Sequence, residues 1–428
     1  MNNHHIRSST HSMIVPRLIP LLLAGAVATA FGGAEPAFNE TWPQWRGPTR
    51  DGVHRGAPWP DSLEDSRLRL SWRKELGPGY SSPVLNRKHV FTVETEAEEN
   101  EVVRAFDRRT GRQVWRAQWP GAMSVPFFAR ANGSWVRSTP LLDEDRLYVG
   151  GIRDVLVCLD AGTGKERWRV NFPEREESPL PSFGFVSSPV VHGDDIYVQA
   201  GGGFMKLNKH TGETKWKALE DGGGMYGSAF SSPLIGTLHG VAMAIVQTRE
   251  ELAGVDLDSG AALWKQPVKA FRGMNILTPI IHQDAVFTSA YGGRTTLFRT
   301  TASEGRYDIE PAWDNKLQGY MSTPVVHDNH AFLHLRNTRM ACVNLADGSI
   351  AWTSANTFGK YLSLARQNDR ILALDQKGEL FLIRASTDRL IILDKRKISE
   401  QETWAHLALA DGQLFVRELQ GLSVFDWK

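Results

Sequence analysis

The chain has 428 residues, with 49 Lys and Arg against 48 Asp and Glu, so its formal net charge is +1. This balance excludes the basic field on which a nucleic-acid-binding protein depends, and no nucleic-acid partner is expected. A chain of this length would ordinarily contain two or three domains. Its internal repeats instead predict a single closed domain after a short leader.

The leader is expected to be a secretory signal peptide over residues 1–34. Arg17 precedes an apolar stretch from Leu18 to Phe31, and small residues near its end offer sites for cleavage. Such a stretch is too short to remain as a membrane span. A bacterial lipoprotein would carry its acylated Cys after a Leu-Leu-Ala-Gly run, where this chain has Ala26. We therefore expect a mature protein without a membrane span, in the periplasm or outside the cell.

A proline recurs along the chain with Ser or Thr on one side and an apolar residue on the other. Because proline cannot donate a ladder hydrogen bond, it belongs at the first residue of a strand or on a sheet edge. The intervals cluster near the roughly 40 to 50 residues that a four-stranded propeller blade needs. Each proline is expected to begin the innermost strand of a blade: Pro83, Pro140, Pro189, Pro233, Pro279 and Pro324.

A second repeat marks the turn before the outermost strand of each blade. An Asp or Asn opens this turn through its side-chain acceptor, and a Gly closes it with a positive φ. A Trp follows four residues after the Gly in five blades, which predicts one ring packed between adjacent sheets. The turns are residues 107–111, 160–164, 208–212, 258–260 and 344–348, followed by Trp115, Trp168, Trp216, Trp264 and Trp352.

The C-terminal third departs from this pattern, and the number of blades depends on how it is divided. Residues 362–374 predict a seventh inner hairpin, with Ile392 in the place of the Trp. Residues 405–426 predict three strands of an eighth blade, which then lacks its outermost strand. Seven blades is the alternative.

The outermost strand of the last blade is available near the other end of the chain. Residues 68–73 end in Trp72-Arg73, which repeats the Trp-basic pair of the complete blades. A closed ring leaves no free edge. We therefore predict an all-β, eight-bladed propeller of four-stranded antiparallel blades over residues 68–428, closed by an N-terminal strand, with residues 35–67 as an N-terminal extension.

The cysteines and several histidines occupy equivalent places in different blades. Cys158 and Cys342 each lie two residues before the Asp or Asn of a turn, in blades two and six. A disulfide needs Cα atoms within about 7 Å, so these two are expected to stay unpaired. His192, His282 and His327 follow paired apolar residues in three separate blades, so no metal site is predicted. No motif indicates catalytic residues.

The Ser-Ser-Pro strand, the Asp-x-x-Thr-Gly-x-x-x-Trp turn and the eight-fold period resemble pyrroloquinoline quinone (PQQ) propeller repeats, from about Trp42 onward. The run Trp42-Pro43-Gln44-Trp45-Arg46-Gly47-Pro48, followed by Arg50-Asp51-Gly52, is similar to the opening of many exported bacterial members. The resemblance implies the propeller fold. Function depends on the sites that a member carries on that fold.

Two branches of this family imply different functions. Quinoprotein dehydrogenases hold the quinone between a Trp and a disulfide of adjacent cysteines, beside a calcium ion. This chain has no adjacent cysteines, so no cofactor is expected. It is more similar to the non-catalytic branch, propeller lipoproteins of outer-membrane barrel assembly. We favour a monomeric, non-catalytic scaffold of the bacterial cell envelope that binds a protein or envelope component, with a PQQ-dependent dehydrogenase as the alternative.

The segments that lead from an outer strand to the next inner strand reach one face of a propeller, around the channel mouth. Here these segments are aromatic. The rings either fill the tapering channel or form a collar that binds an extended peptide or a sugar. The long connectors 117–137 and 173–181 are expected to fold over this rim. The candidate mouth residues are Tyr80, Trp135, Phe183, Phe185, Tyr226, Phe230, Tyr320 and Tyr361.

Overall fold

The computed structural model describes residues 40–221, 227–410 and 412–428, which belong to one compact unit, Phe38–Lys428. The expected signal peptide over residues 1–34 lies outside the described residues. Across the described ranges, no helix is both long and apolar enough to cross a lipid bilayer. Their regular structure is almost entirely β-strand, which confirms the predicted fold class.

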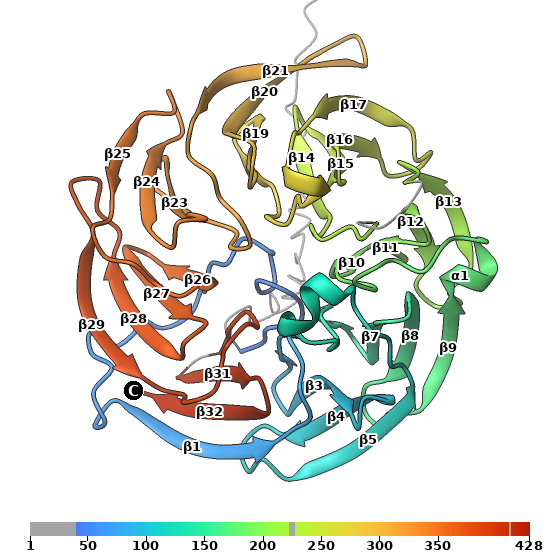
Figure 1. Cartoon of the computed structure of the whole chain (residues 1–428), viewed down its shortest axis with the longest axis vertical. Helices are drawn as coiled ribbons and strands as arrows, with labels where there is room; N and C mark the ends of the chain where they lie inside the picture. The colour runs from blue at the N-terminus through green and yellow to red at the C-terminus, as the bar shows by residue number, and fades with distance from the viewer. Residues whose placement is uncertain (1–39, 222–226, 411) are drawn as a thin grey trace, which may run out of the picture. The chain divides into compact units, whose positions relative to one another are not determined.

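Eight four-stranded antiparallel sheets form the blades, and they follow one another around a central axis (Figure 1). The first blade consists of β2 (Val84–Leu85), β3 (His89–Glu96), β4 (Asn100–Asp107) and β5 (Gln113–Pro120). The second consists of β6 (Leu141–Asp143), β7 (Arg146–Gly151), β8 (Val155–Asp160) and β9 (Glu166–Asn171). The third consists of β10 (Val190–His192), β11 (Asp195–Ala200), β12 (Gly203–Asn208) and β13 (Thr214–Ala218). The fourth consists of β14 (Leu234–Leu238), β15 (Val241–Gln247), β16 (Glu251–Asp256) and β17 (Ala262–Pro267).

The remaining four blades complete the ring. The fifth consists of β18 (Ile280–His282), β19 (Ala285–Ser289), β20 (Thr295–Ser303) and β21 (Arg306–Asn315). The sixth consists of β22 (Val325–His327), β23 (His330–His334), β24 (Met340–Asn344) and β25 (Ile350–Thr353). The seventh consists of β26 (Leu362–Gln367), β27 (Arg370–Asp375), β28 (Glu379–Arg384) and β29 (Ile391–Lys397). The eighth consists of β30 (Ala408–Ala410), β31 (Gln413–Glu418), β32 (Gly421–Trp427) and β1 (Leu68–Glu75).

Proline and bulges mark the two sides of each blade. Each of the six predicted prolines directly precedes an innermost strand, from Pro83 before β2 to Pro324 before β22. In all eight blades the register to the outermost strand shifts at a bulge or irregularity. Bulges increase the local right-handed twist, so the repeat builds a strongly twisted outer edge in every blade.

The eighth blade is composite, as predicted, and the seven-blade alternative is wrong. Strand β1 pairs antiparallel with β32, with Leu68 opposite Trp427 and Glu75 opposite Gly421. Leu68 is fully buried and Trp72 is 9% exposed. The N-terminal strand therefore closes the ring by its ladder, and Figure 1 shows β1 beside β32. Its apolar side chains join the core at the same place.

The recurring tryptophans pack between blades, as predicted. The Trp115 indole Nε1 donates to the Ala161 carbonyl in the turn of the next blade, at 3.0 Å. The Gly of that turn lies against the same ring, since a Cβ at Gly164 would stand 2.5 Å from Trp115. The same bond to a backbone carbonyl joins four further pairs of blades through Trp72, Trp168, Trp216 and Trp352. The Gly and the Trp of one repeat thus serve two different interfaces.

Blades four and five depart from the predicted repeat. The turn in blade four opens at Asp256 rather than Asp258, and the Asp256 carboxylate accepts the Ser259 backbone N–H at 2.7 Å. In blade five, the unpredicted Trp313 supplies the interblade ring and donates to the Leu345 carbonyl at 2.9 Å. A long hairpin, β20–β21, replaces the turn of that blade. Within the described ranges the Trp264 Nε1 of blade four consequently has no hydrogen-bond partner.

Cysteine and histidine positions follow the repeat. Cys158 on β8 and Cys342 on β24 are buried, and neither forms a disulfide. His192, His282 and His327 end the innermost strands of three different blades, as predicted. In the described part of the chain, no three His, Cys, Asp or Glu residues are placed to share a metal ion.

The Ser or Thr before each proline links neighbouring blades around the channel. The Thr139 backbone N–H donates to Ser188 Oγ at 3.1 Å, and the Ser188 N–H donates to Ser232 Oγ at 2.9 Å. The same bond joins Ser82 to Thr139, Ser232 to Thr278, and Thr278 to Thr323. Each hydroxyl satisfies a buried N–H that its own sheet leaves unpaired, as buried donors require. The Ser-Ser-Pro repeat therefore has an interblade role that the sequence analysis missed.

Replacing Ser188 by Ala is expected to lower the free energy of unfolding by about 1–3 kcal/mol, because the buried Thr139 N–H loses its acceptor. Ser188→Thr keeps an acceptor at the same place, as the neighbouring blades do with Thr, and is expected to restore most of the loss. Denaturant unfolding of both variants measures the effect. If the Ala and Thr variants unfold alike, the hydroxyl ring does not contribute.

Candidate functional site

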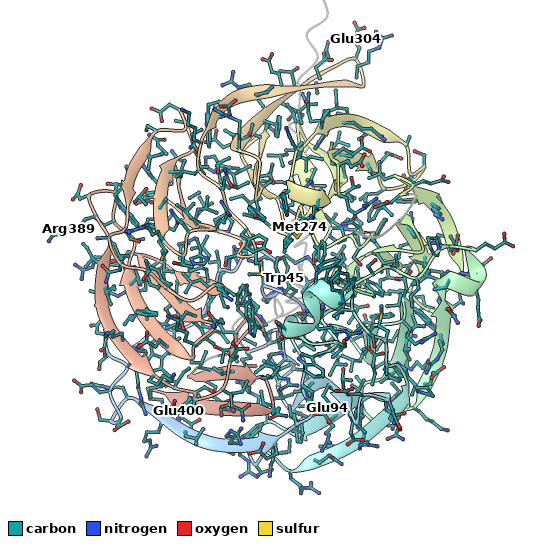
Figure 2. All side chains as sticks on the ribbon, in the orientation of Figure 1. Trp45, Glu94, Met274, Glu304, Arg389 and Glu400 are labelled. Atoms are coloured by element: carbon teal, nitrogen blue, oxygen red, sulfur yellow. The ribbon has the colours of Figure 1, made fainter. Side chains whose placement is uncertain are left out.

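A cavity of about 710 Å³ opens at the channel mouth, on the face that the connectors between blades reach. All eight connectors contribute lining residues, and so does Trp45 from the N-terminal segment. Figure 2 shows two lining residues, Trp45 and Met274, near the centre of the ring, with Glu304 and Arg389 at its periphery. The cavity volume falls in the range that protein ligand sites occupy.

Five of the eight candidate mouth residues line this cavity: Tyr80, Phe183, Phe230, Tyr320 and Tyr361. Two others lie outside its lining. Phe185 is 2% exposed and packs edge-on against Phe172 in the core between blades. Trp135 is half-buried beside Gly133. Tyr226 falls outside the described residues.

The mouth rings contact one another in three groups. Trp404 lies between Tyr80 and Tyr361, with ring centroids 5.9 Å and 6.4 Å away. Tyr291 and Tyr320 meet edge-on at 5.1 Å. Phe183 contacts Phe230 at 5.4 Å and Phe128 at 6.5 Å. Phe128 belongs to the short helix η1 (Phe127–Asn132), so the connector 117–137 does fold over the rim, as expected.

Four cationic side chains line the same cavity, and the sequence analysis did not single them out: Arg137, Arg272, Arg336 and Lys360. The Arg336 guanidinium lies 4.4 Å from the centre of the Tyr291 ring, and Arg137 lies 5.1 Å from that of Tyr80. Cation–π contacts of this length are attractive and hold the guanidinium flat against the ring. Arg137, Arg272 and Lys360 lie in connectors between blades, whereas Arg336 lies in the β23–β24 loop within blade six, so no shared repeat position marked the four residues in the sequence.

The N-terminal segment contributes Trp45 to the cavity lining. Arg46 and Arg50 contact this ring without lining the cavity themselves, and the three residues are called the floor. Both guanidinium groups lie 5.7 Å from the centre of the Trp45 ring. Arg46 Nη2 donates to the Pro324 carbonyl at 2.6 Å, and Arg50 Nη1 donates to the Pro189 carbonyl at 2.7 Å. The floor is thereby fixed to the prolines that begin two innermost strands.

Burial shifts the pKa values of the titratable side chains at the mouth and the floor. Desolvation lowers the pKa of Arg46 to about 10 and that of Arg50 to about 9, so both remain charged at neutral pH. Desolvation, and secondarily the Arg46 charge, lower the pKa of the lining His406 to about 4, so its imidazole is neutral there. Burial raises the pKa of Tyr361 and Tyr320, which keeps their hydroxyls protonated.

The rim around the cavity exposes apolar side chains. Phe127 of η1 is 80% exposed, and Phe271 of η2 (Phe271–Gly273) is 43% exposed. Leu180, in the connector after the short helix α1 (Phe172–Arg175), is 38% exposed, but its neighbours Pro179 and Pro181 line a separate pocket and not this cavity. Large apolar side chains that gather at one opening are typical of a binding surface. None of the described lining residues is a carboxylate that would serve as a general base.

The fold and the mouth together define a PQQ-like β-propeller with a cavity at one end of its channel. The family model described as outer membrane protein assembly factor BamB matches residues 99–354, and the chain belongs to this family. The resemblance seen in the sequence is thereby confirmed.

Curated relatives carry the same name at low identity. BamB of Shewanella oneidensis is 21% identical over 383 residues, which cover 82% of this chain and 87% of the relative. BamB of Yersinia pestis is 20% identical over 393 residues, covering 86% and 90%. These names describe an assembly factor and not an enzyme, in agreement with the prediction of a non-catalytic propeller.

Solved structures share the fold with both branches. BamB from Moraxella catarrhalis superposes with a TM-score of 0.60 at 14% identity, covering 84% of this chain and 98% of that one. Quinohemoprotein alcohol dehydrogenase from Comamonas testosteroni gives 0.65 at 13% identity, covering 92% and 81%. At such identities the likeness concerns the propeller alone.

Proposed function

We propose that the mature protein is a non-catalytic scaffold of the bacterial cell envelope, which captures a protein partner at the channel mouth and serves outer-membrane protein assembly. The observation that carries this proposal is the aromatic mouth, with exposed Phe127 and Phe271 around a lined cavity. Exposed aromatic side chains over a rigid platform are typical anchors of protein interfaces. Family membership supports the role in assembly, and the sequence pattern of residues 1–34 supports export to the periplasm.

The rim is also suited to binding a partner without catalysing a reaction. Its anchors stand on connectors that a closed propeller holds in place, so little conformational entropy is lost when a partner orders against them. The lining offers tyrosine hydroxyls and flat rings, which bind without a reactive group. Among the described lining residues the imidazole belongs to His406, which is buried. Desolvation lowers its pKa, so the ring is neutral at physiological pH.

Photo-crosslinking in intact cells tests this function. A photoreactive amino acid at position 127 is expected to give a discrete crosslink to an envelope protein, because that side chain is exposed at the rim. The matched control is position 70 on the outer strand β1, where Leu70 is 53% exposed. The double variant Phe127→Ser and Phe271→Ser should weaken capture about tenfold or more without changing the melting temperature.

Leu70→Ser and Ile350→Ser form the control pair, since both side chains are exposed on outer strands. These substitutions are expected to leave partner capture unchanged. Equal crosslinking from positions 70 and 127, or equal capture by both double variants, would place the partner elsewhere and refute docking at the mouth.

A further inference from the structure

The charge of the mouth differs from that of the chain as a whole. The formal net charge is +1 over 428 residues. The cavity nevertheless gathers Arg137, Arg272, Arg336 and Lys360, and its described lining contains neither Asp nor Glu. Like charges gathered in a concave, partly apolar site produce a positive potential that attracts anions. The structure therefore concentrates cationic groups at one opening of an almost neutral protein.

Three of these cations are held in place without a carboxylate partner within the described part of the chain. Arg137, Arg336 and Lys360 form no ion pair there, whereas many cations on the outer strands do, such as Arg167 with Asp145 and Asp160. Rings fix the guanidinium groups of Arg137 and Arg336 from one side. A guanidinium that lies over a ring keeps N–H groups at its edge for a carboxylate. One Nη2 N–H of Arg137 already donates to the Gly133 carbonyl at 2.7 Å, which leaves its other N–H groups.

The floor adds two buried charges beneath these side chains. Arg46 is 1% exposed and Arg50 is 4% exposed. Their hydrogen bonds run chiefly to backbone carbonyls, and both Nε atoms lack hydrogen-bond partners among the described residues. The carboxylate of Asp51, the acidic group next to them in sequence, is engaged by Arg55. Buried cations without a bonded carboxylate extend the positive field into the channel.

The rim restricts the class of anion. Phe127 and Phe271 have no hydroxyl or amide, so their exposed surface is best covered by apolar side chains. Near them lie tyrosines and cations that suit carboxylates. A peptide that alternates acidic and apolar side chains supplies both at the period of an extended strand, whereas an anionic sugar leaves polar groups against the two Phe surfaces.

We propose that the channel mouth recognises an acidic, extended peptide segment of the partner, whose carboxylates meet Arg137, Arg336 and Lys360 while its apolar side chains cover the aromatic rim. This inference rests on the proposed function, since it takes the partner to be a protein. It adds recognition of carboxylates by cationic side chains, which the aromatic residues alone do not provide.

Binding of defined peptides to the purified mature protein tests the inference. The probe is a short peptide that alternates Glu and Leu, labelled with an uncharged dye, and the comparison is the same peptide with Gln for Glu. Fluorescence anisotropy is expected to show binding of the Glu peptide only, with affinity falling as salt rises because exposed charges are screened. Arg336→Gln with Lys360→Gln should weaken binding about fivefold or more.

The matched control is Arg69→Gln with Arg299→Gln, which removes two exposed cations on β1 and β20 and should leave affinity unchanged. Equal binding of the Gln peptide, equal affinity of both double variants, or tighter binding of an anionic oligosaccharide such as oligogalacturonate would overturn the inference. If crosslinking at position 127 persists in the variant with Arg336→Gln and Lys360→Gln, the partner docks at the mouth but is not selected for its acidic residues. If the purified protein binds the Glu peptide but position 127 gives no crosslink in cells, the specificity for acidic peptides stands and the proposed docking function is refuted.

Discussion

A variant that begins at Gly77 is expected to lose the stable propeller. This deletion removes β1, and with it the buried Leu68 and Trp72 side chains. Loss of one large buried side chain costs about 2–5 kcal/mol, so the two together equal much of the stability of an ordinary domain. The deletion also leaves the β32 edge open to pairing with other chains. Thermal unfolding and light scattering should show a melting temperature lowered by many degrees together with aggregation.

Two further variants separate the strand from the segment that precedes it. A variant that begins at Asp61 keeps β1 and removes the floor of the cavity, so it should fold, with a smaller loss of stability. In the second variant, residues 67–75 follow Lys428 through an Asn-Gly turn, which suits two antiparallel strands. This repair keeps the native register, because Leu68 lies opposite Trp427 and the Lys428 N–H donates to the Arg67 carbonyl. If the variant that begins at Gly77 melts like the intact protein, closure by β1 contributes nothing.

Gly164→Ala is expected to destabilise the propeller by about 3–5 kcal/mol, through left-handed backbone strain and overpacking together. The Gly164 φ is +73°, and a Cβ there would stand 2.5 Å from a ring atom of Trp115. Trp115 is 8% exposed and its indole is bonded to the Ala161 carbonyl, so the ring cannot move without losing that contact. Denaturant unfolding measures the loss.

Gly240→Ala is the matched control for this substitution. The Gly240 φ is +77°, and no heavy atom lies within 4 Å of the Cβ position. The control therefore carries the backbone strain alone, about 1–2 kcal/mol, and the difference between the two variants reports the contact with Trp115. Equal losses would mean that the turn and the preceding blade are not coupled through the ring.

The repeat made most of the fold predictable. Pro83 and its equivalents marked the innermost strands, and Trp72-Arg73 identified the strand that closes the ring, because both signals recur at a fixed period. The prediction of the interblade tryptophan was wrong in blade five, where the repeat itself is interrupted. Blade five has a long β20–β21 hairpin instead of the Thr-Gly turn, so the interblade role of Trp313 had no sequence signature.

The mouth was predicted only in part. Aromatic residues in the connectors indicated a collar, and five of them line the cavity. Phe185 occupies a connector of the same kind but packs into the core, because its side chain turns toward Phe172 instead of the channel. Sequence position specifies which connector a residue belongs to, whereas the direction of its side chain depends on the local backbone and its neighbours.

The sequence by itself determined the all-β class, the eight blades, the composite closure and the separation of the two cysteines, since each follows from a periodic signal that local strand and turn chemistry explains. Only the tertiary structure decided what the repeats do to one another: Gly164 against the Trp115 of the preceding blade, and Ser188 as acceptor for the N–H of Thr139. It also brought Arg137 and Arg336, almost 200 residues apart, to one cavity. These relations depend on ring closure, which places residues from distant blades side by side around one channel, and no local pattern encodes that proximity.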